Sequence, residues 1–249
     1  GAVKQASDYL ATADKLLGAN QRCELHNLAF SVRWQATECS LLLAALDRAE
    51  ELIAECFFYA GSALERASTH RLVATLKTLR SDHEGAISAA LAGLDLLESP
   101  LTRKPTEADQ DKLYRQIRKM IVHRPIASLT SLPRMDRPDI EVAMELLSTL
   151  ISSFFVHDGM GFMHLAKMVE LTLLHGVCPS SCYGLAWFGV MIASRYEAYR
   201  DGHAFVQLAL DIGELHGYEA GRTSALLALD QVSPWTLPLD FAKQQARKA

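Results

Sequence analysis

Apolar residues recur at spacings of three and four along almost the whole chain, and the strict alternation that marks β-strands is nearly absent. Clusters of Gly, Pro, Asn, Asp and Ser interrupt this pattern at short intervals. The interruptions divide the chain into about eleven helices, and only the segments 99–108 and 123–138 are long enough to form irregular loops. Because short turns join most neighbours, the pattern predicts an all-α protein built from antiparallel helix hairpins.

Three of these hairpins share an internal register. Each places a small residue, Ala49, Ala86 or Gly202, in the first turn of its second helix, where it lets the paired helices approach closely. The separation from Ala49 to Ala86 is 37 residues, and that from Ala86 to Gly202 is 116, about three times 39. This period is typical of helix-hairpin repeats, which bury their apolar faces by stacking on neighbours. The sequence therefore predicts a right-handed α-solenoid of the tetratricopeptide type.

The predicted organisation is one tetratricopeptide-like domain over residues 1–241. The repeats are most regular over 20–98, blurred over 105–175 and regular again in a hairpin over 180–216. Residues 242–249 are interpreted as a C-terminal tail or a cloning end. The initial Gly1 and the basic end favour a fragment of a longer protein.

Two segments are apolar around nearly their whole circumference, 160–174 and 183–196, and both are expected to lie inside the fold. Trp187 and Phe188 should fix the second of them there. The proline-rich segment 123–138 has two interpretations, a loop docked through Ile126, Leu129, Leu132 and Met135 or an edge that binds a partner. Trp235, in a segment that ends the helical pattern, is expected to cover an open end of the repeat.

Composition narrows the class of protein. The chain is 49% hydrophobic and 22% charged, as in an ordinary folded protein, and its net charge is −4. No run of Lys or Arg forms the basic stripe of a nucleic-acid surface, and no apolar segment reaches membrane-spanning length, so neither partner is expected. Five scattered cysteines do not form a secreted disulfide framework and indicate reduced thiols in the cytoplasm.

One stretch combines potential metal ligands: His164, His175, Cys178 and Cys182. The two histidines would lie about three turns, or ~16 Å, apart on one helix, too far to share an ion. Residues 175–176 have the form of a helix end with glycine in the left-handed cap, and Pro179 with Ser180 that of the next helix start. A structural turn is the favoured interpretation, with redox sensitivity and metal binding as alternatives.

No other motif supports catalysis. Phosphate-binding, nucleophile-elbow and zinc-protease signatures are missing from the sequence, and the glycines of 159–161 follow no predicted strand. Glu50 and Glu51, beside Arg48, are typical of a solvated helix face rather than an acid–base pair. We therefore expect no catalytic, cofactor-binding or metal site, and a protein that is not an enzyme.

Four stretches of the chain have a specific sequence pattern: 124–147, 164–176, 180–212 and 232–239. In these stretches the chain resembles the helical, tetratricopeptide-like region that follows the predicted ATPase module of large bacterial signalling proteins. The likeness covers residues 1–241. In that family a serine/threonine-kinase-like domain and an ATPase precede the region, and sensor and output domains, often a histidine kinase, follow it. The family usually has His-Gly-Asn-Ser where this chain has residues 175–178, so both cysteines depart from its pattern.

The resemblance implies a repeat scaffold without active-site residues, placed between a nucleotide-dependent switch and an output domain. Its partners would be proteins or flanking domains of the same polypeptide. An alternative function is a sensor arm, in which the helical region binds a small-molecule effector and shifts an ATPase or transcriptional regulator between states.

Overall fold

The computed structural model describes residues 1–17, 26–156, 159–237 and 240. Within these residues it contains twelve α-helices and two short 3-10 helices, and no strand beyond one isolated bridge between Arg134 and Val177. The all-α prediction is confirmed, with one helix more than the expected eleven. Cys23 lies outside the described residues.

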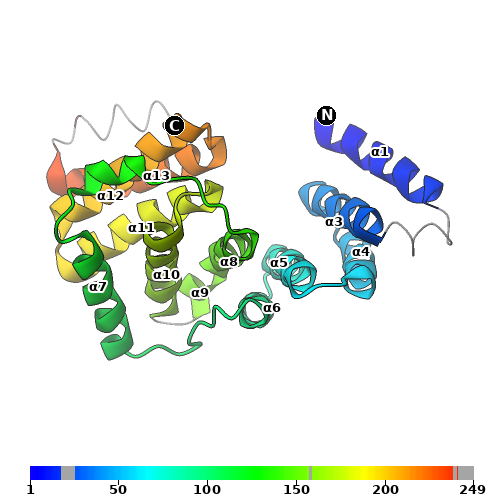
Figure 1. Ribbon diagram of the computed structural model, residues 1–249, viewed down its shortest axis with the longest axis horizontal. Coiled ribbons are helices and arrows are strands. Elements are labelled where there is room, and N and C mark those ends of the chain that lie inside the picture. The colour runs from blue at the N-terminus through cyan, green and yellow to red at the C-terminus, as the bar shows by residue number, and fades with distance from the viewer. Residues whose placement is uncertain (18–25, 157–158, 238–239, 241–249) are drawn as a thin grey trace. The chain divides into compact units, whose positions relative to one another are not determined.

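The described residues form two compact units, which lie within residues 1–101 and 102–249. The prediction of one continuous domain over 1–241 stays a prediction. In the first unit each helix packs on the next along the chain, and α3 also contacts α5 (Figure 1). Its helices are α1 (Ala2–Leu16), α3 (His26–Leu42), α4 (Leu46–Tyr59), α5 (Ala63–Leu79) and α6 (His83–Leu96).

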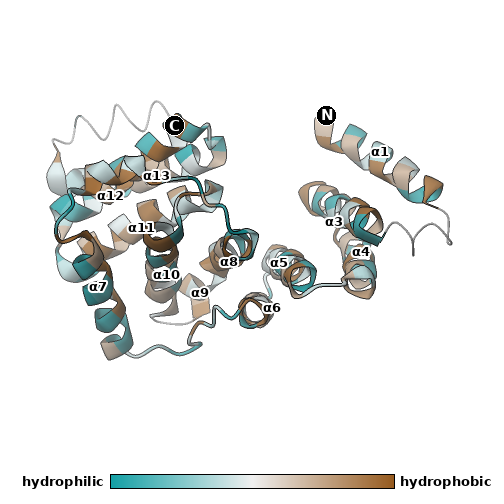
Figure 2. Ribbon diagram, in the orientation of Figure 1, coloured by the Kyte–Doolittle hydropathy of each residue, from teal (hydrophilic) through white to brown (hydrophobic). Residues whose placement is uncertain are grey.

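The second unit is built around α10 (Met160–His175) and α11 (Pro179–Tyr196), the two helices predicted to lie inside. Figure 2 shows the apolar character of α10 along much of its length. Helix α10 packs against α7, α8 and α11, and α11 also contacts α12 and α13. The other elements are α7 (Glu107–Ile121), η1 (Ile126–Ser131), α8 (Pro138–Thr149), η2 (Leu150–Ser152), α9 (Ser153–Val156), α12 (Tyr199–His216) and α13 (Glu219–Thr236).

Four hairpins share one backbone turn. In each, the residue two positions before the second helix has a positive φ: 56° at Ala44, 59° at Ser81, 53° at Glu197 and 70° at Gly217. The N–H of the following residue donates a hydrogen bond to a backbone carbonyl five or six residues earlier, as from Ala45 to Ser40 at 2.9 Å. This arrangement closes a helix C-terminus with a left-handed residue and starts the next helix at once. The same local geometry therefore recurs in both units.

The predicted small residues occupy equivalent places after these turns. Ala49, Ala86 and Gly202 are each the fourth residue of their helices and are buried. A Cβ built on Gly202 would lie 2.5 Å from the carbonyl oxygen of Gly189 and 2.9 Å from Cβ of Ala193. The register predicted close approach at Gly202, and the structure shows that the facing helix also carries a glycine at this point, Gly189.

Two expectations for α11 and α13 need correction. Phe188 is fully buried, but Trp187 is only half-buried, and its Nε1 donates to Oγ of Ser224 on α13 at 3.0 Å. The helical pattern does not end before Trp235, since α13 continues through Pro234 to Thr236. A proline so close to the C-terminus of a helix removes one hydrogen bond without ending the helix. Trp235 is 47% exposed and lies against Tyr199.

The close approach at Gly202 generates a prediction. In Gly202→Ala the added methyl group meets backbone atoms that cannot move aside, and we expect a loss of about 1–3 kcal/mol in the free energy of unfolding. The matched control is Gly213→Ala in the same helix. Its Cβ meets Cγ of Arg222, part of a flexible and half-exposed side chain, so the change in free energy should stay within about 1 kcal/mol. Urea unfolding followed by tryptophan fluorescence measures both, and equal losses would contradict the assigned contact.

Candidate functional site

Within the stretch from His175 to Cys182, residues 176–178 join the end of α10 to the start of α11. His164 and His175 both lie on α10, as expected, and His164 is fully buried while its Nδ1 faces the carbonyl oxygen of Met160 at 3.1 Å. Cys178 and Cys182 are buried free thiols, and burial raises the pKa of Cys182 to about 12. Among the described residues, no group of three or more His, Cys, Asp and Glu side chains is arranged to hold a metal ion.

The details of this turn differ from the predicted caps. Gly176 has φ 98° and ψ −170°, which is not the left-handed helical cap. Its backbone instead leads Val177 into pairing with the loop: Val177 donates to the carbonyl of Pro133 at 2.8 Å and accepts from Met135 at 2.9 Å. A Cβ on Gly176 would lie 2.3 Å from that same carbonyl oxygen of Pro133, so the position requires glycine.

Helix α11 starts at Pro179 and Ser180, as predicted, and the residue that caps it is Cys178. Pro179 is the first helical residue, and the N–H of Cys178 donates to Oγ of Ser181 at 3.1 Å. Thr172 on α10 donates to the same Ser181 oxygen at 3.0 Å. A serine at the third position thus replaces the usual acid of a capping box and joins the two helices at their ends.

The proline-rich loop 123–138 docks onto the second unit. Leu129 is 2% exposed, and Ile126, Leu132 and Met135 are half-buried. The segment also contains η1, which packs against α12, a helical turn that the sequence did not indicate. The docked interpretation accounts for these residues, and the partner-binding interpretation stays open because the other side of the loop lines a groove.

This groove, named the α7 groove here, has a volume of about 720 Å³ and lies between α7, the loop and α12. One part of its lining is apolar, with Val122 67% exposed, and another part is cationic. The lining residues are Arg115, Arg118, Lys119, Ile121, Val122, Arg124, Pro125, Ile126, Ala127, Asp201 and Ala204. Its only acid, Asp201, pairs with Arg118, whereas Lys119 and Arg124 make no ion pair within the described residues.

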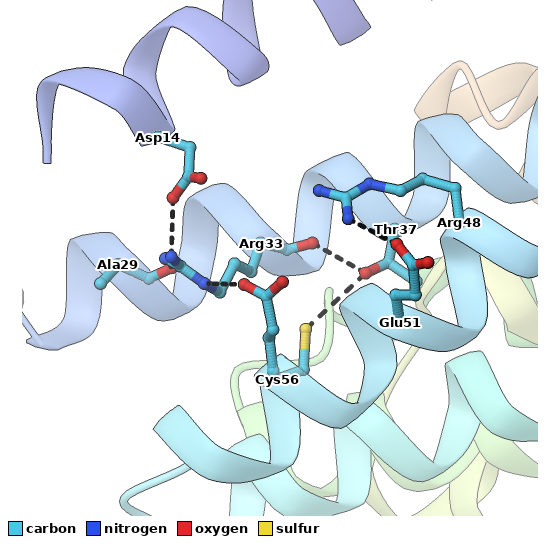
Figure 3. Close-up of polar contacts among 8 residues, drawn as sticks. Asp14, Ala29, Arg33, Thr37, Arg48, Glu51 and Cys56 are labelled. Carbon is cyan, nitrogen blue, oxygen red and sulfur yellow. Dashed lines mark hydrogen bonds and ion pairs between the residues drawn. The ribbon is translucent and has the colours of Figure 1, made fainter.

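A second candidate lies in the first unit around Arg33 of α3 (Figure 3). The Arg33 side chain is 2% exposed and pairs with Asp14 of α1 and Glu55 of α4, each at 2.7 Å. It also donates to the carbonyl of Ala29 at 3.2 Å and lies over the ring of Tyr59 at 4.5 Å. A guanidinium is a planar cation with five N–H donors, so Arg33 is suited to binding carboxylates from two helices at once.

The surroundings of Arg33 form a cavity of about 210 Å³ between α1, α3 and α4. Lys15, Arg33 and Arg48 contribute positive charge to it, and Asp14 contributes negative charge. Thr37, one turn after Arg33, donates to the Arg33 carbonyl at 2.8 Å and contacts Sγ of Cys56 (Figure 3). Burial raises the pKa of the Cys56 thiol to about 11, which leaves it protonated and unreactive.

The acids singled out in the sequence are solvated, as expected. Glu51 pairs with Arg48 on the exposed face of α4 at 2.8 Å, and Glu50 pairs with Arg80 at 2.7 Å. Gly159 starts α10 with φ 88° and Gly161 lies within that helix, so these glycines serve the helix start. None of the described helices has both the length and the apolar content needed to cross a bilayer.

The buried Arg33 generates a prediction about packing and charge. Arg33→Ala should lower the free energy of unfolding by about 2–4 kcal/mol, because it leaves a void beside Tyr59 and removes the cation between two acids. Arg33→Met refills most of the void, and both acids are over a third exposed and can rehydrate, so its cost should stay below about 1.5 kcal/mol. Hydrogen exchange of the backbone amides of α1 and α3 measures the loss of stability in both variants. If Arg33→Met loses as much stability as Arg33→Ala, the ion pairs rather than the packing hold α1.

His164 generates a prediction about pH. Burial lowers its pKa from 6.5 to about 4, so the folded chain keeps the ring neutral where the unfolded chain protonates it. The free energy of unfolding should therefore fall as pH decreases from 6.5 toward 4, by at most about 1.4 kcal/mol per pH unit from this group. Half-buried His203 has a lowered pKa too and adds to the same trend.

The test compares His164→Gln with His123→Gln, an exposed control, by urea unfolding between pH 7.5 and pH 4. The amide of the first variant keeps a donor for the Met160 carbonyl without titrating, so its unfolding free energy should depend less on pH than that of the parent chain. An unchanged pH dependence would show that His164 does not contribute.

The chain was compared with known proteins. No family model matches it, and neither the curated proteins nor the solved structures include a match. Its function is therefore inferred from its own residues and their geometry.

Proposed function

We propose that this chain is a non-catalytic helical-repeat scaffold that mediates protein–protein or interdomain contacts in a cytoplasmic bacterial signal-transduction protein. The observation that carries the proposal is the turn shared by four hairpins, with a left-handed residue before each new helix. Such repetition is typical of tetratricopeptide-like solenoids, whose common role is to present an extended binding surface. The resemblance of residues 124–147 and 180–212 to the helical region of signalling ATPases supports a place for this scaffold in a signal-transduction protein.

Two further observations support the proposal, one for the binding role and one for the cytoplasmic setting. The α7 groove is open, and it combines aliphatic side chains with Lys119 and Arg124, whose charges no described acid neutralises. The four described cysteines are free thiols, which agrees with a reducing compartment. A surface that is both apolar and charged is suited to a protein ligand, since apolar contacts supply affinity and charge supplies specificity.

The second candidate function is an effector-sensing arm, and the cavity at Arg33 is the observation that favours it. The cavity is small and is lined by three cationic side chains, Lys15, Arg33 and Arg48, so a metabolite with a carboxylate or phosphate group would fit its charge. Binding there would tighten α1 on α3 and α4.

Two binding measurements on the purified chain distinguish these functions. Segments that flank it in the full-length polypeptide are titrated by calorimetry, and a panel of anionic metabolites is screened by thermal shift. The scaffold predicts saturable binding of a flanking segment and no metabolite-specific shift. A rise of several degrees with one metabolite, lost in Arg48→Ala, together with no protein binding, would replace the scaffold by the sensor arm.

A further inference from the structure

The charge of the chain is distributed unevenly, and the excess of positive charge lies around α7. Residues 103–124 contain seven Lys and Arg against three Asp and Glu, a net charge of +4, although the whole chain carries −4. Since the remainder then carries −8, this segment is a basic island in an acidic protein. The sequence reading missed it because the basic residues are spread at helical spacing and do not form a run.

Each acid of α7 contacts another residue of the second unit, whereas most basic side chains of α7 make no ion pair within the described residues. Asp109 caps the helix by accepting from Thr106 at 2.8 Å, and Asp111 accepts from the hydroxyl of Tyr196 at 2.7 Å. Glu107 lies 3.8 Å from Arg195. The contacts of Asp111 and Glu107 with α11 hold the N-terminal half of α7 on the unit, and a hydrogen bond from Gln116 to Glu170 of α10 adds to them. In the C-terminal half, Arg118 pairs with Asp201, whereas Arg115 and Lys119 are exposed and pair with no acid of the described residues.

The basic side chains line two hollows that share a border. Arg115 and Lys119 belong to the α7 groove and also to a second hollow of about 600 Å³, which Lys112, Gln116 and Met120 complete. Lys112, Arg115 and Lys119 follow one another at helical spacing, and Arg124 continues the cationic lining beyond the end of the helix. From Lys112 to Ile121 the helix rises about 14 Å, which matches about two and a half turns of a bound helical peptide.

The lining of the α7 groove distinguishes between anionic partners. More than half of its residues are apolar, including Val122, Ile126 and Ala127, and none is aromatic. Single-stranded nucleic acids need aromatic side chains on which bases stack, and an acidic protein repels a long polyanion. A membrane surface binds convex amphipathic faces, whereas here the apolar side chains line a hollow. A polypeptide that carries aliphatic side chains beside carboxylates fits both parts of the lining.

We propose that the α7 groove receives an acidic, amphipathic segment of a partner protein, with its carboxylates on Arg115, Lys119 and Arg124 and its aliphatic side chains against Val122 and Ile126. This inference rests on the proposed scaffold function and names the chemistry of its partner. The bound segment needs two or three acids on one side and two aliphatic residues on the other, as in a short helix laid along α7.

The test selects ligands from a displayed library of random 12-residue peptides against the whole chain. We expect enriched peptides to carry net negative charge together with Leu, Ile or Val, and to bind more weakly as salt is raised. Synthetic versions, measured by fluorescence anisotropy, should bind the variant Lys119→Glu/Arg124→Glu at least about tenfold more weakly than the parent chain. Val122→Ser should weaken binding several-fold without changing its dependence on salt.

The matched control is Lys4→Glu/Arg66→Glu, which changes the net charge by the same amount at exposed positions of the first unit. It should bind the selected peptides as the parent chain does. The inference would be overturned if both double variants lost the same affinity for the peptides, or if the selected peptides were not enriched in acids. It would also be overturned if the peptides bound Lys119→Glu/Arg124→Glu as tightly as the parent chain. Tighter binding of an oligothymidylate or of phosphatidylglycerol vesicles that depends on the same two residues would contradict it as well.

The outcomes also separate this inference from the proposed function. If a flanking segment binds the parent chain and the Lys119→Glu/Arg124→Glu variant equally, the scaffold function stands and the α7 groove is not its binding site. If no flanking segment binds, the scaffold function itself fails, whatever peptides the groove selects.

Discussion

Four hairpins, two in each unit, depend on one backbone constraint, a left-handed residue two positions before the new helix. With a positive φ at Ala44, Ser81, Glu197 or Gly217, the chain reverses within two or three residues and the next helix starts beside the previous one. Three of these four residues are not glycine and accept a conformation that side chains disfavour. The tight packing of paired helices, and the small residues at Ala49 and Gly202 that permit it, follow from this reversal.

The sequence predicted the helical class and the close helix pairs because both depend on local patterns. Spacing of apolar residues identified α10 and α11 as interior helices, and the small-residue register identified Gly202 as a position of close helix approach. It could not give the cap at Cys178, because a cysteine rarely holds that position and its partner Ser181 is recruited by Thr172 from another helix.

The candidate site was harder to predict than the fold. The α7 groove combines residues from α7, the loop and α12, and no local motif relates Arg124 to Ala204. Nor does the sequence reveal which charges are neutralised, since this depends on contacts such as Tyr196 with Asp111 across 85 positions. The buried Arg33 was missed for the same reason, because a polar residue on an otherwise mixed helix gives no sign that two acids and a tyrosine surround it.

The pairing of Val177 with Pro133 and Met135 has a consequence for ligand binding. These two hydrogen bonds fasten the end of the loop to the turn between α10 and α11, while Leu129 anchors its middle. The loop side of the α7 groove therefore loses its conformational freedom when the chain folds rather than when a ligand arrives. A preorganised surface of this kind keeps more of its contact energy as affinity, so even a short segment can be held by a few well-placed side chains.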